Sequence, residues 1–210
     1  MNKEELRAEI IEITKVFQSA KYYSIDFKYV NSVKYKMPIV YQTYYFFIER
    51  IFHSICVSLI LNLCILFDKR EGDSDKLEKF SFEKLCNKMR EGYSTSELSN
   101  YQSKSDFDSI CKNLNNDRVN FLLHKLKTTR DKYYAHLDRT RTTFELIQLN
   151  SSEIDELISI AETLIKTIEL KYFDIHVSFE LSIGELGHTI FERLNEWENY
   201  REKYGLLRMK

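Results

Sequence analysis

The stretch TTRDKYYAHLDRT, residues 128–140, places an arginine, an aspartate and a histidine in one short segment. Arg130 and Asp131 are adjacent, and His136 lies six positions after the arginine. A histidine can take up and release a proton near neutral pH, and a guanidinium can bind phosphoryl oxygens. These residue types together suit a site that acts on a phosphodiester, with His136 for proton transfer and Arg130 for the anion.

A basic row accompanies these residues. Arg118, Lys125, Lys132 and Arg139 recur every seven residues, which places them on one side of an α-helix. From residue 112 to 141 there are eight Lys or Arg against three Asp, whereas the whole chain carries 31 basic and 32 acidic residues. The net charge therefore predicts no general attraction to nucleic acid, and this segment is locally basic. Such a row is also typical of an ordinary solvated helix face.

Arg130 falls within an apolar row of the same predicted helix. The other members of the row are Val119, Leu123, Leu126, Tyr133 and Leu137. An unpaired buried charge is very costly, so the arginine needs an acceptor, a second subunit or a bound anion. A structural network of Arg130, Asp131 and His136 at a dimer interface is therefore an alternative to a catalytic site.

The composition predicts that helices position these residues. The chain has 210 residues with only five Gly and one Pro, too few breakers for a β-sandwich or barrel. A hydrophobic content of 43%, with 14 Tyr and 14 Phe, excludes a disordered chain. We predict an all-α fold: a single domain over residues 1–210, built as a bundle of five or six helices.

Apolar periodicity and capping residues locate the elements. The predicted helices span about 3–23, 38–67, 81–90, 117–138, 150–173 and 187–204, with helix signals resuming near Asp106. Pro38 suits a first helical position, Ser81 suits a cap, and serines are expected to cap the helix that starts near residue 150. Links are predicted over 24–37 and 91–105, and an extended or irregular crossing over 141–149.

The cysteines and the apolar stretches exclude other classes of protein. Cys56, Cys64, Cys86 and Cys111 form no CxxC pair and have no nearby His at ligand spacing, so we expect buried reduced thiols, no metal and no cofactor. Residues 55–67 are apolar except for Ser58 and Asn62, but 13 residues fall short of the roughly 20 that a membrane span needs.

A central buried helix is therefore preferred to a membrane-associated protein. Ser54, Ser58 and Asn62 lie on one face of that helix, where local hydrogen bonds are a simpler reading than catalysis. The N-terminal residues show no secretory signal, so a cytoplasmic protein without stable membrane association is expected.

The run RDKYYAHLD resembles the signature of the HEPN superfamily. In that signature an arginine and a polar residue precede a histidine by four to six positions near the end of a helix, and Arg130, Asp131 and His136 match it. Together with the earlier run SLILNLCILFD, it resembles the abortive-infection, AbiU-type branch in particular. The resemblance covers residues 41–172 or so.

The resemblance implies a metal-independent endoribonuclease that acts as a homodimer and serves as a defence or toxin effector. Six residues of an α-helix correspond to a rise of about 9 Å and a rotation of about 240°, so Arg130 and His136 of one helix do not point at one atom. Two antiparallel copies of residues 117–138 about a two-fold axis would bring each arginine toward the other histidine.

The implied roles can be assigned to single residues. His136 would transfer the proton, Arg130 would stabilise the phosphoryl oxygens, and Asp131 would orient an oxygen by hydrogen bonding. The residues expected to bind the RNA substrate are Lys125, Lys132, Tyr133 and Arg139, although the spacing of Tyr133 fits core packing equally well. A neutralising antitoxin or regulator is a further expected partner. One related group has a modified Tyr two residues after the histidine, but position 138 is Asp.

Overall fold

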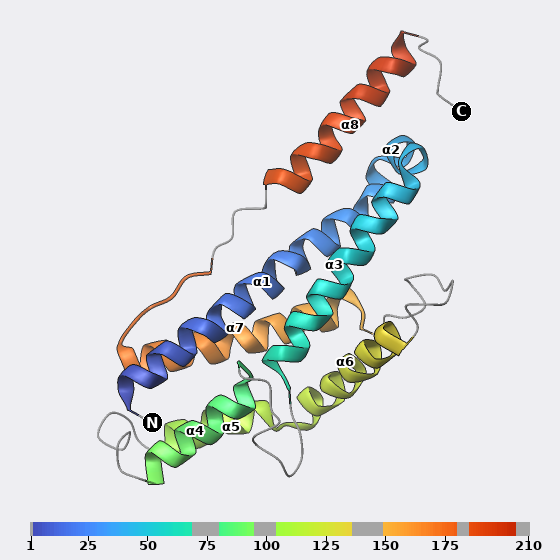
Figure 1. Ribbon diagram of the computed structural model, residues 1–210. Coiled ribbons are helices and arrows are strands. Elements are labelled where there is room, and N and C mark those ends of the chain that lie inside the picture. Colours follow the sequence, from blue (N-terminus) through green and yellow to red (C-terminus); the bar gives the residue numbers. More distant parts are fainter. Residues whose placement is uncertain (1, 69–79, 95–103, 136–148, 180–184, 205–210) are drawn as a thin grey trace. The chain divides into compact units, whose positions relative to one another are not determined.

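The computed structural model describes residues 2–68, 80–94, 104–135, 149–179 and 185–204, with the side chains of 104–106, 132–135 and 185–189 left out of the description. These residues form α-helices and no strand (Figure 1). The helices are α1 (Lys3–Lys36), α2 (Pro38–Thr43), α3 (Tyr45–Leu66), α4 (Phe82–Ser94), α5 (Lys104–Leu114), α6 (Asp117–Ala135), α7 (Ser151–Phe173) and α8 (Glu185–Lys203). The all-α prediction is confirmed, but the described chain has eight helices instead of five or six.

The chain divides into two compact units. The first contains Met1–Lys21 and Leu59–Phe179, and the second contains Tyr22–Ser58 and Glu180–Lys210. Because the divisions fall inside α1 and α3, each of these two helices contributes a part to both units. The candidate site on α6 belongs to the first unit, and α8 belongs to the second.

The predicted link over residues 24–37 is wrong, because α1 continues without interruption to Lys36. Phe27, Val30 and Val33 are buried at steps of three, so the apolar pattern of the helix persists through this stretch. No Gly or Pro stands in the stretch before Pro38. The polar residues and tyrosines between the buried positions hide the pattern in the sequence.

Pro38 begins a helix, as predicted, but that helix is short. The single helix expected over residues 38–67 is divided at Tyr44, whose φ of −112° and ψ of 26° leave the helical region. The backbone N–H of Tyr44 still donates to the carbonyl oxygen of Val40 at 2.9 Å. The chain then re-enters a helix at Tyr45, and α3 ends at Leu66.

Helix α7 supplies much of the core of the first unit. Its buried apolar residues are Ile154, Leu157, Ile158, Ala161, Leu164, Ile165, Ile168 and Tyr172, in agreement with the predicted periodicity. The cap differs from the prediction, because Asn150 and not a serine begins the helix. The Asn150 side chain accepts from the Glu153 N–H at 2.9 Å, and the Glu153 carboxylate accepts from the Asn150 N–H at 2.9 Å. This reciprocal arrangement is a capping box.

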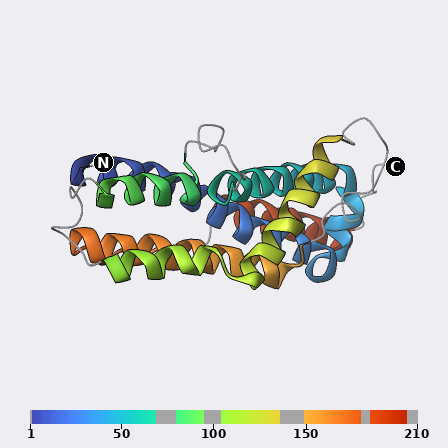
Figure 2. The ribbon, with the colours of Figure 1, turned by 90° about the horizontal axis from the view of Figure 1, so that it is seen from below.

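The other helices of the first unit pack around α7 and the first part of α1. Figure 2 shows α5 alongside α7 and α4 alongside α1, where Lys88 and Glu9 form an ion pair. Tyr93 of α4 bonds to the Tyr172 hydroxyl at 2.6 Å, which ties α4 to α7. Ser81 accepts from the Lys84 N–H at 3.2 Å, so the predicted cap of α4 is confirmed, although the helix runs to Ser94 and not to Arg90.

The second unit is held together by aromatic contacts. Phe27 stacks on Phe52 with ring centroids 5.3 Å apart, and Tyr29 contacts Phe191 of α8 at 5.9 Å. The Tyr44 hydroxyl donates to the buried Glu198 carboxylate at 3.1 Å. Phe191 and Glu198 therefore fix one face of α8 to the rest of this unit.

Helix α3 is the one helix in the described chain that is long and apolar enough to cross a membrane. Only 33% of its most apolar 18-residue window is buried. Length and composition alone are weak grounds for a span, since core helices pass the same test. The cytoplasmic location that the sequence suggests therefore stays a prediction.

Candidate functional site

Helix α6 positions the candidate site. The Asn116 side chain accepts from the Val119 N–H at 2.8 Å and so caps the helix, a position where Asn is favoured. Val119, Leu122 and Leu126 are buried and fix one face of the helix against the core. Thr129 continues this buried face, and its hydroxyl donates to the carbonyl oxygen of Lys125 at 2.8 Å. Arg130 follows directly, at the edge of the buried face.

Arg130 and Asp131 form a hydrogen-bonded ion pair near the end of the described part of α6. The arginine Nε and Nη2 both donate to Oδ1 of Asp131, at 3.0 and 2.8 Å. The Arg130 side chain is 31% exposed and the Asp131 side chain 57% exposed, so the pair lies at the surface and not in the core. The acceptor that the sequence required for this arginine is supplied, at least in part, by its neighbour.

The end of α3 adds two further groups beside the arginine. Desolvation lowers the pKa of Arg130, but the hydrogen bond to Asp131 and the nearby Cys64 and Asp68 outweigh it and raise the pKa. Burial raises the pKa of the Cys64 thiol to about 12, against the opposing effect of Arg130. Cys64 is therefore a neutral thiol at physiological pH, and Arg130 is a permanent cation facing two carboxyl groups.

Asp68 is a site residue that sequence reasoning missed. It is buried, with 8% of its surface exposed, and it interacts electrostatically with Arg130. Buried carboxylates are rare unless they have partners. The sequence feature that could have identified Asp68 is its place at the end of the run SLILNLCILFD, directly after an apolar helix.

The remaining predicted residues are placed only in part. His136 and Arg139 lie outside the described residues. Lys132 and Tyr133 belong to α6, but their side chains are not described. The structure therefore brings Arg130 and Asp131 together with Cys64 and Asp68, and the predicted partnership with His136 stays a prediction.

The described members of the basic row, Arg118 and Lys125, form ion pairs with carboxylates of α7. Arg118 donates two hydrogen bonds to Oε2 of Glu156, at 2.6 Å from Nη2 and 3.1 Å from Nε. The Lys125 ammonium lies 2.6 and 2.7 Å from the two oxygens of Glu153, which is buried. Desolvation raises the pKa of Glu153, but Lys125 and the Asn150 N–H outweigh it and lower the pKa. Any RNA contact of Lys125 must compete with this ion pair.

No group of three or more His, Cys, Asp or Glu side chains that could hold a metal ion occurs among the described residues. None of the four cysteines, all of which lie in the described part of the chain, forms a disulfide; Cys56 and Cys86 are buried, whereas Cys64 and Cys111 are partly exposed. A hydrogen bond with Cys111, together with burial, raises the pKa of the Cys86 thiol well above its ordinary range. Cys86 and Cys111 contribute to packing between α4 and α5, whereas Cys64 lies beside Arg130.

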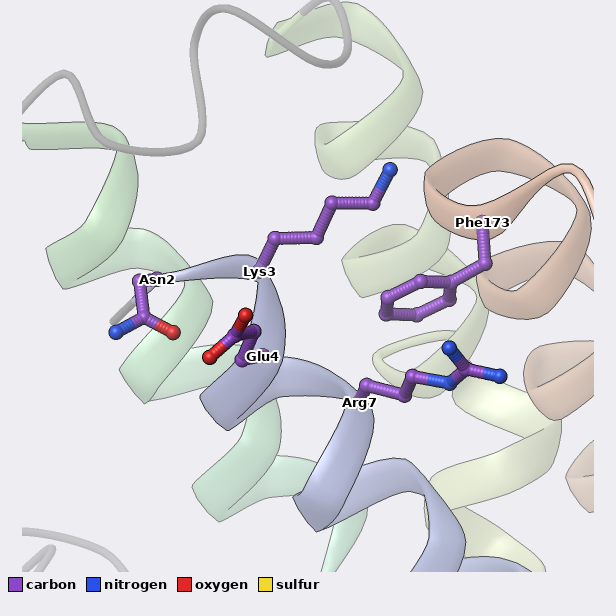
Figure 3. A pocket seen from close by; sticks show the side chains of 5 residues that line it. All are labelled: Asn2, Lys3, Glu4, Arg7 and Phe173. Atoms are coloured by element: carbon purple, nitrogen blue, oxygen red, sulfur yellow. The ribbon is translucent and has the colours of Figure 1, made fainter.

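A separate pocket of about 420 Å³ lies where the start of α1 meets the end of α7 (Figure 3). It is lined by Asn2, Lys3, Glu4, Arg7 and Phe173. The Lys3 ammonium and the Arg7 guanidinium lie 5.7 and 6.0 Å from the centre of the Phe173 ring, within range of cation–π attraction. These contacts fasten the first turn of α1 to α7, and neither residue of the Arg130–Asp131 pair lines the pocket.

The comparisons with known proteins identify the family. The sequence model of the HEPN family named AbiU2 matches residues 3–185, which include α1 to α7 and the Arg130–Asp131 pair. No curated protein and no solved structure matches the chain. The match extends over far more than half of the sequence and agrees with the all-helical fold. The chain therefore belongs to the AbiU2 family of HEPN proteins.

Proposed function

We propose that this protein is a metal-independent endoribonuclease that acts as a homodimer in abortive infection. Membership of the AbiU2 family indicates a defence role. The observation that carries the catalytic proposal is the half-exposed Arg130–Asp131 pair near the end of α6, six residues before His136 in the sequence. These are the residue types, spacing and helix position that the HEPN signature requires.

The proposed reaction uses the RNA as its own nucleophile. The ribose 2′-oxygen attacks the adjacent phosphorus while the bond from phosphorus to the 5′-oxygen breaks, which leaves a 2′,3′-cyclic phosphate and a 5′-hydroxyl. His136 takes the 2′-hydroxyl proton or delivers one to the leaving oxygen, and the guanidinium of Arg130 stabilises the charge on the phosphoryl oxygens. Asp131 holds the guanidinium by the two hydrogen bonds seen in the structure.

The charges around Arg130 limit where RNA can be bound. Two carboxyl groups, Asp131 and Asp68, interact with this one cation, so Arg130 can stabilise a phosphoryl group that is already bound but adds little long-range attraction to the RNA. Arg118 and Lys125 are already paired with carboxylates of α7. We therefore expect Lys132 and Arg139 to supply most of the attraction to the RNA backbone. Their substitution should reduce the salt dependence of RNA binding.

The test is a cleavage assay with end-labelled single-stranded RNA in excess chelator. We expect cleavage to persist in the chelator, to yield cyclic phosphate ends, and to fall about 10²- to 10⁴-fold in His136→Ala, the usual range for the loss of general acid–base catalysis. The variant should unfold at the same temperature as the wild type. A fully active His136→Ala protein, or cleavage that the chelator abolishes, would contradict the proposal.

A non-catalytic assembly module of a defence or toxin–antitoxin system is the second candidate. The observation that favours it is that Arg130 already has Asp131 and Asp68 beside it within one chain, as a structural network would require. In that case Arg130→Ala lowers the free energy of unfolding and the wild type cleaves no RNA. The binding partner would then be an antitoxin or regulator, to be captured with the intact Arg130–Asp131 surface.

A further inference from the structure

Helix α8 presents two different faces. Phe191 and Glu198 are buried in the second unit at 2% exposure each. On another side of the helix, large side chains remain exposed: Ile190 at 46%, Trp197 at 52%, Tyr200 at 50% and Tyr204 at 57%. Large aromatic side chains in such numbers on one exposed helix face are typical of an interaction surface.

The exposed side chains form a regular stripe. Ile190, Arg193, Trp197, Tyr200 and Tyr204 follow steps of three, four, three and four residues, which is the spacing of a coiled-coil seam. The Tyr204 N–H donates to the Tyr200 carbonyl oxygen at 3.1 Å, so the backbone is still helical at Tyr204, the last residue of the stripe. The five residues are called the α8 stripe below.

The rings of the α8 stripe are already ordered within one chain. Trp197 and Tyr200 are stacked, with centroids 6.0 Å apart and ring planes at 12°, and the Tyr200 and Tyr204 centroids are 4.5 Å apart. Ordered rings lose little further conformational entropy when a partner binds them. Tyr, Trp and Arg are also the residue types that contribute most at protein interfaces.

Family membership does not account for the α8 stripe. The family match ends at residue 185, where α8 begins, so the stripe lies beyond the matched domain. Its role is therefore to be sought separately from the Arg130 site.

We propose that the α8 stripe pairs with the α8 stripe of a second copy of this chain, in an antiparallel arrangement whose two-fold axis passes between residues 198 and 199. In this register Trp197 lies opposite Tyr200 of the second copy. Arg193 lies opposite Tyr204 of the second copy, where it makes a cation–π contact. By symmetry each contact occurs twice, so Arg193, Trp197, Tyr200 and Tyr204 form four layers that are all aromatic or cation–aromatic, and Ile190 lies beyond these layers.

The flanking charges select the antiparallel register. Glu196 and Lys203 are exposed beside the stripe, and in this register Glu196 of each copy faces Lys203 of the other. A parallel pair in register would instead place Arg193 against Arg193 within the seam, which is repulsive. In the parallel pair Glu196 would face Arg201 of the other copy. Arg201 is mostly buried and bonds to Glu198 at 3.1 Å, so it is not available for this contact. Opposite charges therefore match only in the antiparallel pair.

Single-stranded RNA is a poorer fit to the same surface. Bases bind to aromatic platforms through free ring faces, with cations along the backbone. Here Trp197 and Tyr200 stack on each other, and the Glu196 carboxylate, which would repel phosphate, lies in the sequence between the two cations Arg193 and Lys203. The α8 pairing also does not depend on the proposed ribonuclease activity, because it uses residues of α8 alone.

Charge exchange on the full-length protein tests the register. We expect Glu196→Lys and Lys203→Glu each to weaken self-association at least about tenfold in sedimentation equilibrium, because each turns two attractive pairs into repulsive ones. The double variant should restore association to within about threefold of the wild type. Glu202→Lys is the matched control, since it makes the same charge change on the same helix away from the stripe, and it should leave association unchanged.

Trp197 provides an independent readout, because it is the only tryptophan in the chain. Its fluorescence should shift to shorter wavelength as the protein concentration rises, and this shift should be absent in Glu196→Lys and return in the double variant. The shift reports on α8 even if another surface also holds two copies together.

Three results would each overturn the proposal. The first is a wild type whose Trp197 emission is independent of concentration. The second is a pair of single variants that associate like the wild type, or a double variant that does not recover. The third is a Trp197→Ala variant that loses affinity for a labelled RNA oligonucleotide while its self-association is unchanged, which would assign the stripe to nucleic acid. RNA cleavage by the same variants is a separate measurement, so loss of this proposal leaves the ribonuclease proposal standing.

Discussion

Helices α6 and α8 each span 19 residues and combine cations with aromatic rings, but the fold treats them differently. On α6 the cations Arg118 and Lys125 are matched by carboxylates of α7. On α8 the stripe, which includes Arg193, is left exposed beside Lys203. Side chains that the fold leaves available are better candidates for function than side chains of the right chemical type. By that criterion the α8 stripe stands out, whereas Arg130, which is paired with Asp131, is singled out by its spacing from His136 in the sequence.

The largest expected difference is in RNA cleavage, between substitutions of two arginines of α6. Arg130→Ala should lower RNA cleavage about 10²- to 10³-fold, the usual effect of removing one group that stabilises the transition-state charge. Arg118→Ala is the matched control on the same helix: its side chain pairs with Glu156, so cleavage should stay within about twofold. Single-turnover rates on one RNA measure both. Equal losses in the two variants would show that the basic row acts as a general surface and not through one site.

The second largest expected difference is in stability, between substitutions of the two α7 carboxylates that pair with α6. Glu153 is buried, caps α7 and accepts two hydrogen bonds from Lys125. Glu153→Ala leaves the ammonium and the Asn150 N–H without their acceptor, which should lower the free energy of unfolding by about 1 to 3 kcal/mol. Glu156→Ala, which removes the exposed partner of Arg118, should change it little. Urea denaturation distinguishes the two, and a larger loss in Glu156→Ala would contradict the geometry.

The pKa shifts of two buried carboxyl groups of α7 predict that their contributions to folding stability change in opposite directions with pH. Glu153 has a lowered pKa, so its contribution to stability is present above its ordinary pKa and is lost as the pH falls through the folded value. Burial raises the pKa of Glu169, only partly offset by Arg7, so its contribution is present below the ordinary pKa and is lost as the pH rises through the folded value.

Glu169→Gln should therefore raise the melting temperature at pH 7 relative to the wild type and have less effect at pH 4. Glu153→Gln should lower the melting temperature at pH 7, and this loss should shrink toward acidic pH. Melting curves at the two pH values measure both. A Glu169→Gln protein that is less stable than the wild type at pH 7 would show that the ionised carboxylate is a net favourable group.

The sequence predicted the class of fold well because helix signals are local. The steps of three and four along α7, the Ser81 cap and the Pro38 start all act within a few residues, and each is found in the structure. The continuation of α1 through residues 24–36 was missed because its buried positions are separated by Tyr, Lys and Asp, which a local reading takes for a link. The break at Tyr44 has no Gly or Pro to mark it.

The candidate site was predictable only where its parts are neighbours in sequence. Arg130 and Asp131 are adjacent, so their pairing could be foreseen. Asp68 reaches Arg130 only through the packing of α3 beside α6, which no local pattern contains. The basic row was seen as a possible RNA surface because its spacing is visible, whereas its carboxylate partners lie on α7, more than twenty residues away.

Two equally exposed rings give the smallest expected effect and the sharpest test of the contrast between α6 and α8. Phe121 on α6 and Trp197 on α8 are each 52% exposed. At protein concentrations low enough to separate the copies, Phe121→Ala and Trp197→Ala should each change the free energy of unfolding by less than about 0.5 kcal/mol, as for other surface substitutions.

The two variants should separate as the protein concentration rises. If the α8 stripe pairs two copies, association stabilises the folded state by mass action, and the melting temperature of the wild type increases with concentration. Phe121→Ala should retain this increase, because Phe121 lies outside the stripe. Trp197→Ala should show a smaller increase, because the substitution removes two of the four seam layers by symmetry. A concentration-dependent melting temperature that survives in Trp197→Ala and disappears in Phe121→Ala would place the contact between copies on α6 instead.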